Sequence, residues 1–357
     1  MSEFLLLIAL LALGPFLLVE GLLARYELMV YTIGRRAPAA TLPPEVPYAR
    51  GADPGRPPDA YVVYLDGIGK RRFTDTRDGG QLVKAIIAGA PELRVLGQVQ
   101  PYSPMAEPLV GRPAWDWLRR HVGITLFLHN VMQTFVAADR RYRPLYNRAV
   151  GAQIADQLRL AGYEPASGIP VVLLCYSGGA QSATGAVEEL FLQLGAPLWL
   201  ITLGGFHNGA NDLTHALHLY RLTSPNDWIE RVGVGLFPQR WRLWRRSAWN
   251  QALDAGKITV HSLDPAAHVG PQSYMSPTAR LADGRSYLDR TTETVIEIIR
   301  RDLRQKSSEG EKATLTLKAS GFPCTAERKG AETDAAPKSF YCMGSCKSGG
   351  DRPLLRT

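Results

Sequence analysis

From residue 60 onward, short apolar stretches rich in β-branched residues alternate with longer stretches that carry apolar residues at helical spacing. "YVVYLDGIGK" predicts a strand and a glycine-containing turn, "GGQLVKAIIAGA" a helix, and "LRVLGQV" a second strand. The alternation resumes after residue 144 and closes with a helix that ends near Arg304. This pattern favours an α/β fold with a mostly parallel, doubly wound sheet, in which ligands bind at the carboxyl ends of the strands.

The composition of the 357 residues divides the chain into segments. Residues 1–25 are apolar, residues 26–59 are a Pro- and Gly-rich linker, residues 60–305 form the folded domain, and residues 306–357 are a polar, aperiodic tail that we expect to be disordered. Within the domain, residues 102–144 interrupt the alternation and are expected to form a helical insertion or cap.

The N-terminal apolar stretch, residues 4–24, contains one charge, Glu20, and as a helix is long enough to cross a hydrocarbon core of about 30 Å. We expect a single transmembrane anchor. A cleaved signal peptide is the alternative, but "MSE" supplies no basic residue and no small-x-small cleavage site follows. Arg25, Arg35 and Arg36 on the C-terminal flank predict a single-pass protein of the cell membrane with its domain in the cytoplasm.

A second membrane span is not predicted. The insertion contains "AWDWLRRHVGITLFLHNVMQTFVAADRRYR", which is apolar, aromatic and helical in character, but His129, Asn130 and Gln133 interrupt it.

The net charge of +8 is spread along the chain without a run of Lys and Arg, so it does not favour a nucleic-acid partner. An anionic membrane surface or ordinary surface charge explains it equally well. Cys175 falls in a predicted strand, while Cys324, Cys342 and Cys346 lie in the tail, beyond the last histidine. Three thiols are one ligand short of a closed zinc site, and no phosphate-binding glycine motif occurs, so no metal and no organic cofactor is expected.

Residues 171–186, "VVLLCYSGGAQSATGA", place a serine where a strand turns into a helix. In a nucleophile elbow the serine occupies a strained turn, and the residues two positions away must be small. Cys175 and Gly179 meet that requirement on either side of Ser177, with cysteine in place of the usual glycine. The alternative is a serine that only caps the helix.

With this elbow, the chain resembles the α/β-hydrolase superfamily over residues 60–304. The order nucleophile, acid, histidine is also present: Asp227 follows a predicted strand in "SPNDWIE", and His268 precedes the last helix in "DPAAHVGPQSY". The resemblance implies a catalytic triad of Ser177, His268 and Asp227. "SPND" is also a good turn and helix cap, which leaves Asp212 as a second candidate for the acid.

The same resemblance implies an oxyanion hole made by the amide of Gly178 and an amide of the "DGIG" turn, either Ile68 or Gly67. Asp66 in this turn departs from the common His-Gly form, and we expect its carboxylate to bind backbone amides of the loop. "ITLGGFHNGANDLTH" is similar to a lipase loop through His207 and Gly209.

"PQRWRLWRRSAW", residues 238–249, places Trp241 and Trp244 a helical turn apart among arginines, as in a helix at a membrane interface. A surface helix that packs its tryptophans on the domain is the alternative.

Together these features predict a membrane-anchored serine hydrolase that cleaves a carboxylic ester or lipid acyl bond through an acyl-enzyme. An acyltransferase with the same triad is one alternative. A catalytically silent binding module at the membrane is another, because a fold does not determine a function.

Overall fold

The computed structural model describes residues 2–32, 56–68, 77–97 and 123–319, with isolated positions 113, 117 and 121. The chain forms two units, Met1–Gln305 and Lys306–Thr357. Only residues 306–319 of the second unit are described, as the C-terminal part of a helix.

The centre of the first unit is a six-stranded sheet in the order β2-β1-β3-β4-β5-β6, in which every neighbouring pair is parallel. The strands are β1 (Ala60–Leu65), β2 (Leu93–Leu96), β3 (Val171–Tyr176), β4 (Leu198–Leu203), β5 (Ala216–Thr223) and β6 (Ile258–Ser262). The predicted α/β class with a parallel sheet is confirmed. Because the chain passes from β1 to β2 and then returns to the other side of β1, the strand order reverses between β1 and β3.

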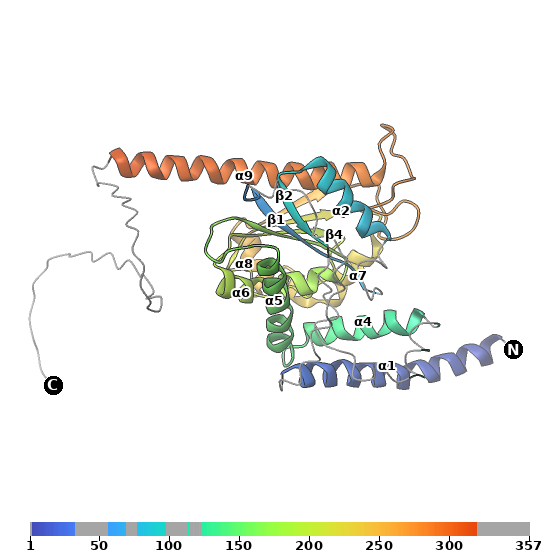
Figure 1. The fold of residues 1–357 in the computed structure, drawn as a ribbon. Helices are drawn as coiled ribbons and strands as arrows, with labels where there is room; N and C mark the ends of the chain where they lie inside the picture. The colour runs from blue at the N-terminus through green and yellow to red at the C-terminus, as the bar shows by residue number, and fades with distance from the viewer. Residues whose placement is uncertain are drawn as a thin grey trace, which may run out of the picture. The chain divides into compact units, whose positions relative to one another are not determined.

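Helices cover both faces of this sheet (Figure 1). The described helices are α1 (Ser2–Thr32), α2 (Arg77–Gly89), α4 (Gly123–Ala138), α5 (Arg143–Leu160), α6 (Gly179–Leu194), α7 (Trp228–Leu236), the 3₁₀ turn η2 (Pro238–Arg240), α8 (Ala248–Asp254) and α9 (Tyr287–Ala319). In β1, Tyr61 and Val63 join the core formed with α5 and α6, whereas Val62 and Tyr64 join the core formed with α2 and α9. This alternation follows from the two-residue period of a strand, and it explains why buried strands are apolar at consecutive positions.

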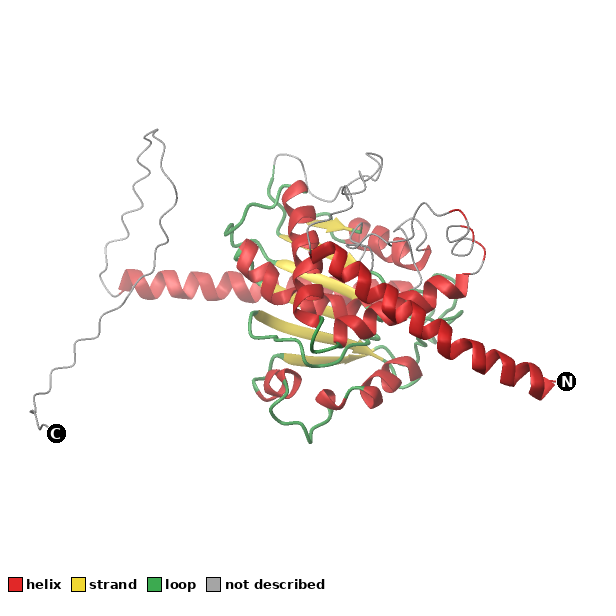
Figure 2. Cartoon of the chain, turned by 90° about the horizontal axis from the view of Figure 1, so that it is seen from below, coloured by secondary structure: helices red, strands yellow, loops and turns green. Residues whose placement is uncertain are grey.

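The N-terminal helix α1 packs against α4, and in Figure 2 it extends past the strands to the marked N-terminus. It continues to Thr32 and carries Glu20 and Glu27, so it is longer and more polar than the span predicted for residues 4–24. In the part of the chain that the structure describes, no helix is both long enough and apolar enough to cross a membrane.

Several predicted boundaries differ from the structure. The helix α9 continues to Ala319, so the tail predicted for residues 306–357 begins with helix; positions 320–357, with the three tail cysteines, lie outside the described residues. The predicted linker, residues 26–59, begins inside α1, and positions 33–55 are likewise not described. Of the predicted insertion, residues 102–144, the structure describes chiefly α4 and the start of α5, both helical as expected.

The basic tryptophan segment, residues 238–249, does not form one continuous helix. Trp241 and Trp244 lie in consecutive turns between η2 and α8, with the indole nitrogen of Trp241 donating to the carbonyl of Val234 at 2.8 Å. Pro238 starts the 3₁₀ turn, and the hydroxyl of Ser247 caps α8 only after the tryptophans, accepting from the amide of Asn250.

Candidate functional site

Ser177 lies in the sharp turn between β3 and α6, with a φ of 50° that non-glycine residues rarely adopt. The turn is fixed by backbone hydrogen bonds: the Ser177 amide donates to Leu203 (3.0 Å), and the Phe206 amide donates to the Ser177 carbonyl (2.9 Å). A Cβ at Gly179 would lie 2.5 Å from the carbonyl oxygen of Leu65, so only glycine lets α6 approach β1 this closely. The strained strand-to-helix turn predicted from the sequence is present.

The three residues of the predicted triad lie in one hydrogen-bonded series. Nε2 of His268 is 2.8 Å from Oγ of Ser177, and Nδ1 of His268 is 2.8 Å from Oδ2 of Asp227. All three side chains are buried. Since Ser177 follows β3, Asp227 follows β5 and His268 follows β6, parallel strands bring together positions up to 91 residues apart.

Asp227 caps a helix and also contacts His268. Its Oδ1 accepts the Glu230 amide at 2.9 Å as the N-cap of α7, while its Oδ2 faces His268 and accepts the Tyr274 hydroxyl at 2.9 Å. Burial alone would raise the pKa of Asp227, but the hydrogen bond and charge of His268, with the Glu230 and Tyr274 donors, hold the pKa below its usual value. The other candidate acid, Asp212, lies in a separate turn and accepts from Thr214.

Two tyrosines support the pair of His268 and Asp227, and the sequence analysis did not identify either. Tyr274 donates to Asp227, and burial followed by the nearby Asp227 charge raises the Tyr274 pKa, so its hydroxyl stays protonated. Tyr176 stacks on the His268 ring, with centroids 5.0 Å apart, and its hydroxyl donates to the His268 carbonyl. Tyr176 adjoins Ser177, which offered a local signal, whereas Tyr274 had none.

Gly204 is the third residue that the sequence did not single out. It has a φ of 52°, and a Cβ there would lie 2.9 Å from Nδ1 of His268 and would collide with Oδ2 of Asp227. The close approach of the β4 loop to the His268–Asp227 hydrogen bond therefore requires glycine at this position.

The loop after β1 lies against the serine, since a Cβ at Gly67 would be 3.1 Å from Cβ of Ser177. The Gly67 amide is already engaged, because it donates to Oδ1 of Asp66 at 2.8 Å, and Tyr64 donates to the same oxygen at 3.0 Å. As expected, Asp66 binds a backbone amide of its own loop. Of the predicted oxyanion donors, Gly178 and Ile68 remain: among the described residues, neither amide donates to a protein group.

Cys175 and His207, which the sequence analysis named beside the triad, lie outside the hydrogen-bonded series. The Cys175 thiol points at the carbonyl of Ile201 (3.5 Å), and burial raises its pKa, which keeps it protonated. His207 is buried against Trp249, and burial followed by the charges of Arg240 and Arg221 lowers its pKa, so its imidazole is neutral. Within the described residues, no group of three or more His, Cys, Asp or Glu side chains is arranged to hold a metal ion.

Ser177 and the loop after β1 therefore lie where the strand order reverses, at the carboxyl ends of β1 and β3, which is the usual ligand position in open α/β sheets, and the loops after β5 and β6 bring Asp227 and His268 to the same place. A hydroxyl in contact with an imidazole that is held by a carboxylate can be deprotonated as it attacks an electrophile. No protein-family model matches this chain, and a search of curated proteins finds no match to its sequence.

Proposed function

We propose that this chain is a membrane-anchored serine hydrolase of the α/β-hydrolase type, cleaving the carboxylic ester bond of a lipid or another acyl substrate. The observation that carries the proposal is the unbroken series from Ser177 Oγ through His268 to Asp227, each link 2.8 Å long, at a serine with positive φ. A serine that only capped a helix would need neither the imidazole nor the strained turn.

In the acylation step, Ser177 Oγ attacks the ester carbonyl carbon while its proton passes to Nε2 of His268. Asp227 stabilises the imidazolium that forms, and the amides of Gly178 and Ile68 would donate to the oxyanion. Collapse of the tetrahedral intermediate breaks the bond to the alkoxy oxygen, which leaves as the alcohol with the proton held by His268. The acyl group remains on Ser177.

In the second step His268 takes a proton from water, the hydroxyl attacks the acyl-enzyme, and Ser177 regains its proton as the carboxylic acid leaves. Transfer to another alcohol or an amine would follow the same path with a different acceptor. No organic cofactor or metal is needed for either step. Cys175 and Asp66, the two departures from the superfamily pattern, are compatible with the proposal, since Cys175 faces the core and Asp66 binds its own loop.

The membrane part of the proposal is supported by the apolar stretch at residues 4–24 and by the exposed Trp241, Leu243 and Trp244. Exposed arginines at 242, 245 and 246 accompany these side chains. Aromatic and basic residues together are typical of surfaces that contact anionic lipid. An anchored domain of this kind suits a substrate that resides in the membrane.

The proposal is tested by hydrolysis of p-nitrophenyl esters and of ester lipids in vesicles. Ser177→Ala and Asp227→Asn should lower kcat by about 10⁴-fold, as loss of a triad member does in serine proteases. Ser182→Ala is the matched control, because Ser182 is a buried serine of α6, the helix that follows Ser177, and lies outside the hydrogen-bonded series. Equal rates in wild type and Ser177→Ala would contradict the proposal, and a product carrying a new acyl acceptor would show transfer.

A further inference from the structure

We infer that α4 lies beside α1 in the acyl-chain region of a lipid bilayer, with the polar side chains of both helices turned toward each other. The inference extends the anchoring part of the proposed function from one helix to two. It is independent of the chemistry at Ser177.

On both helices, apolar side chains are exposed and polar side chains are buried, which is the reverse of the pattern on helices that face water. On α1, Leu18 is 63% and Leu22 is 53% exposed, whereas Glu20 is fully buried. On α4, Ile124 is 58% and Phe127 is 41% exposed, while the polar side chains are buried. Water would favour the opposite arrangement, but in lipid, ionisable side chains face other helices and apolar side chains face outward.

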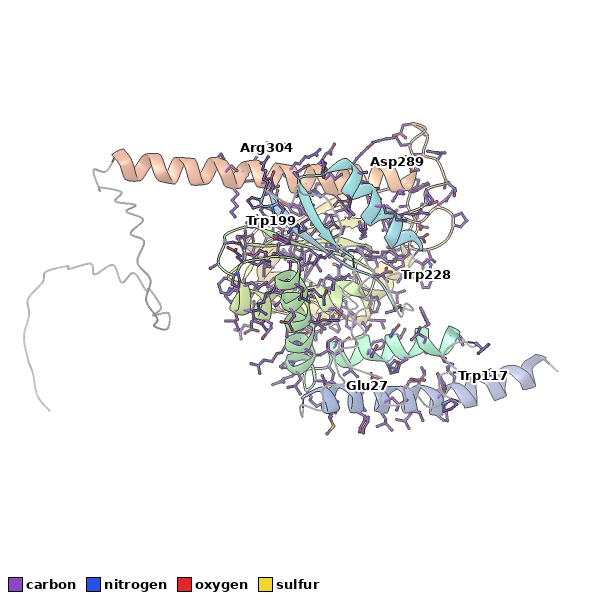
Figure 3. The ribbon with its side chains drawn as sticks, in the orientation of Figure 1. Glu27, Trp117, Trp199, Trp228, Asp289 and Arg304 are labelled. Carbon is purple, nitrogen blue, oxygen red and sulfur yellow. The ribbon has the colours of Figure 1, made fainter. Side chains whose placement is uncertain are left out.

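The buried polar side chains form one cluster between the helices. Nδ1 of His129 is 2.7 Å from Oε2 of Glu20, and Nε2 of His129 is 3.2 Å from Oε2 of Glu27. The side-chain amide of Gln133 donates to the same Glu27 oxygen at 2.9 Å. Figure 3 labels Glu27 where α1 lies against α4. His129, Asn130 and Gln133, which argued against a membrane location when α4 was considered alone, are thus shielded by α1.

The pairing also fixes the direction of the helices. Because Glu20 meets His129 and Glu27 meets Gln133, the two helices run parallel, and their C-terminal ends lie together. At about 1.5 Å per residue, the 16 residues of α4 span about 24 Å. That is most of a hydrocarbon core of about 30 Å, so α4 reaches into the bilayer beside α1 without a full crossing.

A basic aromatic belt marks this shared end. The guanidinium groups of Arg25 and Arg141 lie over the Tyr142 ring, 5.6 and 5.5 Å from its centroid, and Arg140 and Tyr26 are exposed nearby in the sequence. Arginine and tyrosine concentrate at the headgroup level of membranes, where they complement anionic lipid. Apolar side chains along the pair and cations at one end together identify the occupant of the outer face as a bilayer.

The test is photolabelling of the full-length chain in phosphatidylcholine–phosphatidylglycerol vesicles that contain a lipid with a carbene-generating group near the end of its acyl chain. Adducts are located by tandem mass spectrometry. We expect adducts at Ile124 and Phe127 of α4 as well as at Leu18 and Leu22 of α1. Leu160 and Leu192 are the controls, because they are at least as exposed but lie on α5 and α6, and they should remain unlabelled.

Adducts on α1 alone would overturn the inference while leaving the single anchor in place. Equal labelling of Leu160 and Leu192 would overturn it by showing nonspecific adsorption. Chain-to-chain cross-links from Phe127 without lipid adducts would overturn it in favour of a second copy of the chain. Fluorophosphonate labelling of Ser177 in the same vesicles separates this result from the hydrolase proposal, because either readout can fail alone.

Discussion

The Tyr274 hydroxyl donates a 2.9 Å hydrogen bond to Oδ2 of Asp227, the same oxygen that faces Nδ1 of His268. The carboxylate is therefore held from two directions. In the proposed hydrolase Tyr274 would be a positioning residue, since it acts on His268 only through Asp227.

For Tyr274→Phe we expect kcat/KM to fall by about tenfold to 10²-fold, because a hydrogen bond to a charged group contributes about 1.5–3 kcal/mol. Loss of the Tyr274 donor raises the pKa of Asp227 toward its usual value. The Asp227 carboxylate then interacts more strongly with the protonated form of the His268 imidazole. The acid limb of the pH–rate profile should therefore move to higher pH. Tyr163→Phe, which removes a hydroxyl that donates to Ile169, is the matched control. A Tyr274→Phe profile that overlays the wild type would rule out the positioning role.

Gly204 and Gly284 provide a pair of substitutions with the same backbone cost. Both have positive φ, but a Cβ at Gly284 meets open space, whereas at Gly204 it collides with the His268–Asp227 pair. Each alanine should destabilise the fold by about 1–2 kcal/mol through its positive φ, and Gly204→Ala should destabilise it further because of the collision. Only Gly204→Ala should also lower kcat, by roughly 10²-fold, because displacement of catalytic groups is costly. Thermal unfolding and kinetics of both variants check this, and equal activity of the two would be incompatible with the site described.

We expect Asp66 to stabilise the loop after β1 by accepting hydrogen bonds, and not by its negative charge. Asp66→Asn keeps an oxygen that can accept from the Gly67 amide and the Tyr64 hydroxyl, so we expect near wild-type kcat. Asp66→Ala removes that oxygen, loosens the loop, and should lower kcat by about tenfold to 10²-fold, up to the scale of a lost oxyanion donor. The comparison is made on a p-nitrophenyl ester. If Asn and Ala variants lose activity equally, the charge of Asp66 has a role that this account does not include.

Thiol reagents should not inhibit the proposed ester hydrolysis. Cys175 is buried and its thiol pKa is raised by burial, so the reactive thiolate is not formed near neutral pH. N-ethylmaleimide treatment of the native protein should leave ester hydrolysis unchanged, and peptide mapping should find Cys175 unmodified. Inhibition that accompanies modification of Cys175 would show that the thiol communicates with the site.

The sheet and the proximity of Ser177, His268 and Asp227 could be predicted because their signals are local. An apolar strand followed by a serine between small residues identifies the elbow, and each remaining triad residue follows its own predicted strand. In a parallel sheet those strand ends meet at one edge, so three local signals specify one site. Tyr274 and Gly204 gave no such signal: Tyr274 reaches Asp227 across 47 residues of sequence, and the need for glycine at 204 arises from packing.

The environment of α4 was equally hidden. Its polar residues are 102 to 109 positions from the α1 carboxylates that they contact, so the sequence of α4 alone shows only an interrupted apolar helix. The turns around Trp241 and the extension of α9 to Ala319 were missed for a different reason. Helix ends depend on caps and turn hydrogen bonds, such as that from Trp241 to Val234, which periodicity does not reveal.

The most direct test of the activated serine is labelling of the purified protein with a fluorophosphonate probe, followed by peptide mapping. We expect one adduct, on Ser177, that is lost in Ser177→Ala and His268→Ala and retained in Ser182→Ala. A folded wild-type protein that forms no adduct, or an adduct that persists in Ser177→Ala, would contradict this expectation.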